Sequence, residues 1–144
     1  MHLPWTVKFL IALALFLHIA GGINRWYFLF YPFYDKLAHF VAALTIAFML
    51  YLFLLCLGTY SRFKPGRYTI MGIILVTTML FGQAWEYAEL SIDMLFRSTY
   101  YMSSLDSLID STGNFLGAFI IVVIAYYDLK KSSVADVFNR YVQW

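Results

Sequence analysis

The chain has 144 residues, of which 62% are hydrophobic and 21% aromatic, while only 12% are charged. Its mean hydropathy of +0.73 is far above that of soluble proteins, so the composition indicates an integral membrane protein surrounded by a lipid bilayer. The net charge of only +2 and the absence of a dense basic run argue against nucleic-acid binding.

Four apolar stretches follow one another, each long enough for the about 20 residues that a helical span requires. They cover residues 5–24, 35–58, 69–96 and 106–129. The first could be read as a secretory signal with Lys8 as its basic region, but its small-residue site is weak and the later spans need a partner helix. We therefore expect an all-α fold, with one domain of four transmembrane helices over residues 1–129 and a short cytoplasmic amphipathic tail at residues 130–144.

Basic residues in the short loops predict the orientation of the spans. The loop between the second and third spans and the start of the tail hold the clearest basic groups: Arg62, Lys64, Arg67, Lys130 and Lys131. We expect both segments on the cytoplasmic side of the plasma (inner) membrane, which places the N- and C-termini inside. The two outer loops then carry the remaining basic residues near the spans: Arg25, Lys36 and Arg97.

Aromatic residues are concentrated in the two predicted outer loops, at residues 25–34 and 98–104. Tryptophan and tyrosine rings favour the membrane interface, so we expect the first loop to form a short interfacial helix or a re-entrant turn broken by Pro32. The tail is expected to lie on the inner surface as a partly amphipathic strip. The lone Cys56 is interpreted as apolar filler.

Six of the eight acidic residues fall into three polar ridges at helical spacing. The ridges are Asp35 with His39 in the second span; Glu86, Glu89 and Asp93 in the third; and Asp106, Asp110 and Asn114 in the fourth. At about 1.5 Å rise per residue, all three lie within a few turns of the predicted outer surface, and His18 in the first span falls near that level. The sequence therefore predicts that all four spans contribute to one polar site.

Several charges in one place within a membrane require neutralisation, because even one costs about 2.5–3.5 kcal/mol to insert. The basic residues at this level are Lys36, Arg97 and Arg25, and none is expected deep inside a span. A bound cation or retained protons should therefore suit the deepest groups better than internal ion pairs do.

Carboxylates with one histidine suit Zn, Mn or Fe, so a divalent metal ion is the candidate cofactor. The candidate metal ligands are His39, Glu86, Glu89, Asp106 and Asp110. Among them, Glu86, Asp110 and His39 are the candidate catalytic groups. The supporting polar residues are Asp35, Lys36, Asp93 and Asn114.

Simpler structural roles compete with these assignments. Asp35 and Asp106 stand where helix N-caps belong, and His18 can be an interfacial side chain. Asn114 can form an interhelical hydrogen bond. Three glycines suit close helix packing: Gly82, Gly113 and Gly117.

Three segments, "YDKLAHFVAALTIAF", "WEYAEL" and "DSLIDSTGNFLGAF", resemble the pattern of VanZ-like and YjdF-like small membrane proteins over residues 34–118. The resemblance implies a bundle of four or five spans and, through the VanZ-like branch, an association with glycopeptide resistance and the cell envelope. It carries the family's polar positions onto Asp35, Lys36, His39, Glu86, Glu89, Asp106, Asp110 and Asn114.

Three kinds of function remain open. The site could support metal-dependent action on a lipid-linked or cell-envelope substrate at the outer leaflet. Alternatively, the chain could be a small accessory or structural subunit, with other membrane proteins or further copies of itself as partners. The third reading is cation or proton binding in transport, for which four spans leave little room for a pathway.

Overall fold

Helices make up nearly all of the computed structural model, which describes residues 4–30, 33–96 and 104–142. The helices are α1 (Trp5–Ile23), α2 (Trp26–Leu29), α3 (Phe33–Tyr60), α4 (Arg67–Phe96), α5 (Ser104–Lys131) and α6 (Val134–Val142). Four of them, α1, α3, α4 and α5, are long and apolar enough to cross a membrane. The predicted all-α architecture with four spans is therefore confirmed.

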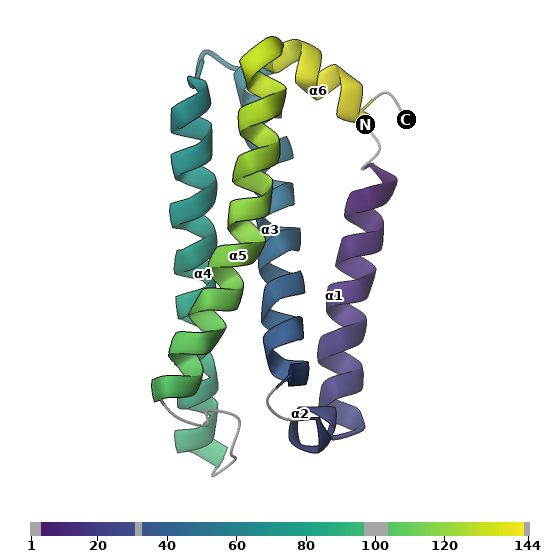
Figure 1. Ribbon diagram of the computed structural model, residues 1–144, viewed down its shortest axis with the longest axis vertical. Coiled ribbons are helices and arrows are strands. Elements are labelled where there is room, and N and C mark those ends of the chain that lie inside the picture. Colours follow the sequence, from purple (N-terminus) through teal and green to yellow (C-terminus); the bar gives the residue numbers. More distant parts are fainter. Residues whose placement is uncertain (1–3, 31–32, 97–103, 143–144) are drawn as a thin grey trace.

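The long helices run side by side, with α3 at the centre (Figure 1). α3 contacts α1, α4, α5 and α6, and α4 also packs along α5. α1 packs along α3 and the short α2. The bundle has two distinct ends, which we call the α2 end and the α6 end after the short helices that lie there.

The aromatic segment before α3 forms the expected short helix, α2, which follows a left-handed residue, Arg25, with φ of 56°. Tyr34 at the start of α3 donates a hydrogen bond to Leu17 O at 2.6 Å and so ties α3 to α1. The predicted break at Pro32, the outer-loop basic residue Arg97 and residues 98–103 of the predicted interfacial segment lie outside the described residues.

Close approach of α5 to α3 depends on Gly117. A Cβ atom there would lie 2.7 Å from Phe40 O and 2.8 Å from Leu44 N, both backbone atoms of α3. At Gly82 of α4 a Cβ atom would collide with the side-chain amide of Asn114. Gly113 is less constrained, because its added Cβ would be in ordinary contact 3.5 Å from Lys36 O. Small residues let membrane helices come close where no hydrophobic effect drives them together.

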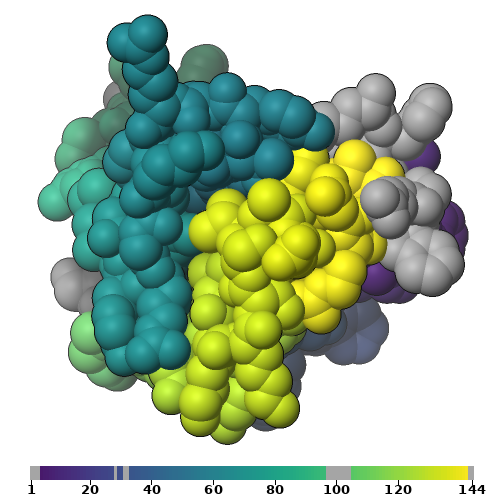
Figure 2. Space-filling model, turned by 90° about the horizontal axis from the view of Figure 1, so that it is seen from above, coloured from purple at the N-terminus to yellow at the C-terminus, as the bar shows by residue number. Residues whose placement is uncertain are grey.

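The apolar core lies toward the α6 end, where α6 folds back onto the bundle. The tail forms the helix Val134–Val142, and its apolar side chains Val137 and Phe138 are buried against the core. Figure 2 looks down on this end and shows α6 in yellow beside the end of α5. α6 therefore closes the end of the bundle with its apolar face, which we had expected to lie on the membrane surface.

Asp128 near the end of α5 anchors α6. Its carboxylate accepts hydrogen bonds from Tyr51 at 3.1 Å and Tyr141 at 2.9 Å, and Arg140 lies 3.5 Å away. Tyr51 belongs to α3, so one carboxylate joins three helices. The spacing of the sequence did not reveal this arrangement, because Asp128 and Tyr51 are 77 positions apart.

Gly117→Ala is expected to destabilise the bundle by about 1–3 kcal/mol, because the new methyl group has only backbone atoms of α3 to displace. Gly72→Ala is the matched control, since a Cβ atom at Gly72 meets nothing within 4 Å. Thermal unfolding in a mild detergent measures both. Equal stability of the two variants would contradict the close approach of α3 and α5.

Burial and the hydrogen bond to Asp128 raise the pKa of Tyr141 above its ordinary value of about 10. A raised folded-state pKa means that this stabilisation is complete below pH 10 and is lost as the pH rises further, because the unfolded chain ionises first. Melting temperature measured against pH should therefore fall less steeply above pH 10 in Tyr141→Phe than in the wild type. Tyr127→Phe, at an exposed position of α5, should keep the wild-type slope.

Candidate acidic and histidine site at the α2 end

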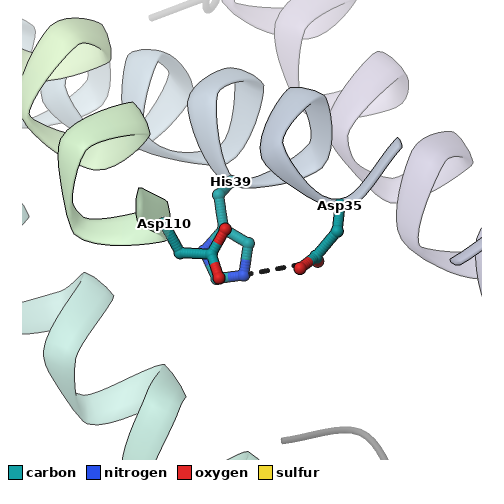
Figure 3. Close-up of side chains that lie close together, drawn as sticks. All are labelled: Asp35, His39 and Asp110. Atoms are coloured by element: carbon teal, nitrogen blue, oxygen red, sulfur yellow. Dashed lines mark ion pairs between the residues drawn. The ribbon is translucent and has the colours of Figure 1, made fainter. Parts of the chain in front are cut away.

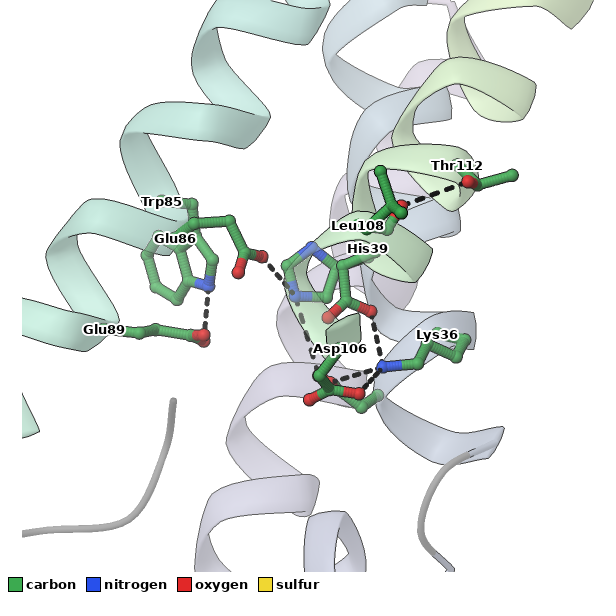
Figure 4. Close-up of polar contacts among 10 residues, drawn as sticks. Lys36, His39, Trp85, Glu86, Glu89, Asp106, Leu108 and Thr112 are labelled. Carbon is green, nitrogen blue, oxygen red and sulfur yellow. Dashed lines mark hydrogen bonds and ion pairs between the residues drawn. The ribbon is translucent and has the colours of Figure 1, made fainter. Parts of the chain in front are cut away.

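Polar residues from α3, α4 and α5 meet at the α2 end, as the ridges predicted (Figure 4). The side chains that are buried there are His39, Glu86, Asp106, Asp110 and Asn114. Half-buried Asp35, Lys36 and Glu89 surround them. The cluster thus brings together residues that are up to 79 positions apart in the sequence, from Asp35 to Asn114. It lies at the end of the bundle opposite α6 (Figure 1).

Lys36 is the cation of this cluster. Its Nζ atom forms ion pairs with Asp106, with Asp110 at 2.8 Å and with Asp35 at 3.5 Å. The expectation that no basic residue reaches the deep acids was wrong, because Asp110 is only 4% exposed and is nevertheless paired. The lysine begins in the first turns of α3, and its long apolar stem carries the ammonium group across to α5.

His39 lies on the other side of the cluster, one turn along α3. Its Nε2 atom is 3.6 Å from Asp35 Oδ1 on its own helix and 3.6 Å from Glu86 Oε1 on α4. Figure 3 shows the imidazole between Asp35 and Asp110. His39 therefore stands where carboxylates from three helices converge.

Glu86 and Glu89 approach this histidine from α4. Glu86 is 4% exposed, and its Oε1 atom accepts no hydrogen bond in the described part of the chain. The Ser107 side chain of α5 lies near the Glu86 carboxyl. Glu89 accepts a 2.7 Å hydrogen bond from the indole N–H of Trp85, one turn earlier on α4. Each glutamate thus has a polar neighbour.

Two groups of side chains bring their potential ligand atoms within 4.8 Å of one another. One consists of Asp35, His39 and Asp110, and the other of His39, Glu86 and Glu89. His39 is common to both. Of the remaining predicted ligands and supporting acids, Asp106 is placed against Lys36, and Asp93 lies farther along α4 and belongs to neither group.

Asp35 and Asp106 are not N-caps. Each is the third residue of its helix, α3 or α5, and so lies inside the first turn. Negative charge in a first turn is still stabilised by the unpaired N–H groups at the helix start. Both aspartates are therefore placed where a carboxylate is least costly and where Lys36 can reach it.

His18 and Asn114 have mainly local contacts. His18 Nδ1 is 2.7 Å from the Tyr27 hydroxyl, and the imidazole lies beside the Trp85 ring with centroids 5.6 Å apart. Asn114 lies against Gly82, where α4 and α5 are close. His18 belongs to neither metal-ligand group of the described residues.

Three neighbours of the site were missed from the sequence: Tyr27, Trp85 and Ser107. Trp85 could have been found, because it stands four residues before Glu89 on a helix, where side chains meet. Tyr27 and Ser107 could not, because their partners lie on other helices whose rotation the sequence does not define.

Comparison with protein families finds one match that covers most of the chain. The family model described as "Predicted membrane protein (DUF2238)" matches residues 1–131. Comparisons with curated proteins and with solved structures find no match.

Lys36→Met is expected to destabilise the protein by about 3–5 kcal/mol, because it leaves buried carboxylates on α5 without their cation. Lys36→Met/Asp106→Asn should recover part of that loss, since one of the stranded charges is removed. Lys131→Met at the exposed end of α5 is the control for loss of a lysine. Unfolding in detergent measures all three, and a Lys36→Met protein as stable as the control would contradict the structural importance of the ion pairs.

Proposed function

The chain belongs to the DUF2238 family of predicted membrane proteins, and from that premise we propose that it is an integral membrane protein that binds a divalent metal ion at its α2 end. The ligands in this proposal are His39, Glu86 and Glu89. The ion serves chemistry on a lipid-linked substrate at the membrane surface.

The orphaned Oε1 atom of Glu86 carries the proposal. A buried carboxylate oxygen without a hydrogen bond leaves a desolvation cost of about 1–3 kcal/mol, and more when the group is charged. In the described residues, the ion-pair partner of this oxygen is His39 Nε2, which lies 3.6 Å away. An ion between imidazole and carboxylate would remove that cost, because it would bind both atoms at about 2.0–2.2 Å after a small movement of the side chains.

Lys36 determines which of the two ligand groups suits the ion. It is already paired with Asp35, Asp106 and Asp110, so that side of the cluster has a cation. Among the described residues, the imidazole of His39 is the basic group that lies beside Glu86 and Glu89. The charge of a divalent ion balances these two carboxylates, so we place it in the group on the α4 side.

One imidazole nitrogen and two carboxylate oxygens suit Zn, Mn or Fe(II) and leave at least one position for water or substrate. The neighbours of the carboxylates fit such a site, because metal ligands are usually held by outer hydrogen bonds. Trp85 holds Glu89 in this way.

The ion would polarise a water molecule or a phosphoryl oxygen of the substrate. Asp110 and Asp35 bring carboxylate oxygens within 4.8 Å of the His39 ligand atom and would accept a proton from an attacking water. In this scheme His39 and Glu86 hold the ion, Asp110 acts as the base, and Lys36 keeps Asp110 in place.

The location of the substrate follows from the proposed orientation. With basic residues 62, 64, 67, 130 and 131 on the cytoplasmic side, both termini are inside and the α2 end faces outward. The resemblance to VanZ-like and YjdF-like proteins favours a cell-envelope substrate in the plasma membrane. Residues 130–144, with α6, then form the cytoplasmic closing segment of the bundle.

A structural role is the second candidate, and the three ion pairs of Lys36 favour it. They join α3 to α5 where the helices begin, as a network that holds a small membrane subunit together would do. In that case the acids are stabilising contacts, and Glu86 retains a proton.

Elemental analysis of protein purified in mild detergent tests the metal proposal. We expect about one equivalent of Zn, Mn or Fe in the wild type, and loss of that ion in Glu86→Gln/Glu89→Gln with the fold retained. Asp93→Asn is the matched control on α4, since Asp93 lies outside the ligand group, and it should keep its metal. A metal-free wild type that also fails to bind added Zn²⁺, Mn²⁺ or Fe²⁺ would overturn the proposal and leave the structural role.

A further inference from the structure

A pocket of about 360 Å³ opens directly beside His39, between α1, α3 and α4. Most of its lining is apolar, with Leu15 from α1, Ala42 and Ile46 from α3, and Phe81 and Trp85 from α4. His39 lies at the end of the pocket nearest the site, because Ala42 and Ile46 follow it by one and two turns along α3. The pocket is mostly apolar along its length, with Thr78 and Asn114 as polar exceptions, and the end at His39 and His18 is the polar end nearest the site.

The pocket opens sideways out of the bundle. The backbones of α1 and α4 do not pack closely, and the two helices meet through the His18 and Trp85 rings, whose centroids are 5.6 Å apart at the His39 end of the pocket. The side chains on its rim are substantially exposed, with Leu15 at 57%, Phe81 at 55% and Trp85 at 48%. Because these helices cross a membrane, the exposed apolar rim faces hydrocarbon chains of lipid.

The polar end of the pocket and the proposed metal site share a residue. His39 lines the pocket and also stands 3.6 Å from the orphaned Oε1 atom of Glu86. Trp85 lines the pocket as well and donates its indole N–H to Glu89. A molecule that fills the pocket therefore has its end beside both glutamates.

We propose that this pocket binds the hydrocarbon chain of a phosphorylated single-chain lipid, which enters sideways from the bilayer and places its phosphate at the His39 end. The inference rests on the proposed function, since it names the substrate class of the same site.

Two features select this occupant. The volume is near the lower limit of the about 300–1,000 Å³ typical of ligand pockets, which suits one chain and leaves no room for two. Lys36 already pairs with Asp35, Asp106 and Asp110, whereas the carboxylates of Glu86 and Glu89 would repel a phosphate unless a further cation is present. Phosphate binding should therefore require the metal ion, whose open position takes an oxygen ligand.

Photolabelling with a long-chain alkyl phosphate that carries a diazirine near the end of its chain tests this inference. In metal-loaded wild-type protein in lipid nanodiscs, peptide mass spectrometry should locate the label on the pocket wall, at Ala42, Ile46 or Phe81. The corresponding alkyl alcohol, which lacks the phosphate, should label the pocket less. Removal of the metal with a chelator should reduce labelling by the phosphate to the level of the alcohol.

Ala42→Phe fills the pocket and should abolish pocket labelling while the metal content stays at the wild-type level. Ala12→Phe, at an exposed position of α1 outside the pocket, is the matched control and should label as the wild type does. Should Ala42→Phe fail to fold, Ile46→Phe fills the same space from one turn away.

The outcomes separate the two proposals. Metal-loaded protein that labels uniformly over its lipid-facing surface, or that labels the pocket equally with and without Ala42→Phe, overturns the lipid pocket while the metal site stands. Stronger labelling by an alkyl ammonium probe than by the phosphate overturns the assignment of the headgroup. A protein that binds no metal overturns the proposed function, whatever the label shows.

Discussion

The pairing of Lys36 with the aspartates of α5 is the interaction on which the α2 end depends. Helices that cross a membrane gain nothing from hiding apolar surface, because lipid is as apolar as they are. Specific contacts must therefore set their positions, and this ion-pair network does so where α3 and α5 begin. Gly117 acts farther along the same helix pair, where the absence of a side chain allows the backbones to approach.

The same ion pairs divide the acids into two groups with different surroundings. The aspartates share a lysine, whereas the glutamates of α4 share a histidine whose charge depends on protonation. Under the proposed function, stability and chemistry belong to adjacent halves of one cluster. If a lysine paired with the glutamates as well, all the carboxylates would already be neutralised. Such a cluster would be stable but would not require a bound metal ion.

Much of the fold could be read from the sequence. Long apolar stretches define spans by length alone, and helical periodicity places Glu86 and Glu89, or Asp106 and Asp110, on one face. The direction of Lys36 could not be read in this way, because a lysine at a helix start is usually directed to water or headgroups. Its partners lie about 70 positions away, and only the rotation of α5 against α3 brings them within reach.

The limits of sequence reasoning were similar at the α6 end. The periodicity of the tail indicates an apolar face, but it does not say what covers that face. Either a membrane surface or the protein core could cover the apolar side chains of Val137 and Phe138. In this structure they are buried in the core. Asp128 was overlooked because a single acid at a helix end has many ordinary explanations, and the tyrosines that identify it as an anchor come from other helices.

The separation of α1 from α4 has a consequence for selectivity. α3, α4 and α5 form a compact trio through direct contacts, whereas α1 rests on α3 and is connected to α4 only through rings such as those of His18 and Trp85. A small change in the tilt of α1 would widen or narrow the passage between them without disturbing the acidic cluster. If the proposed lipid pocket is correct, the thickness and lateral pressure of the surrounding bilayer would act on that tilt, and the membrane itself would influence which molecules reach His39.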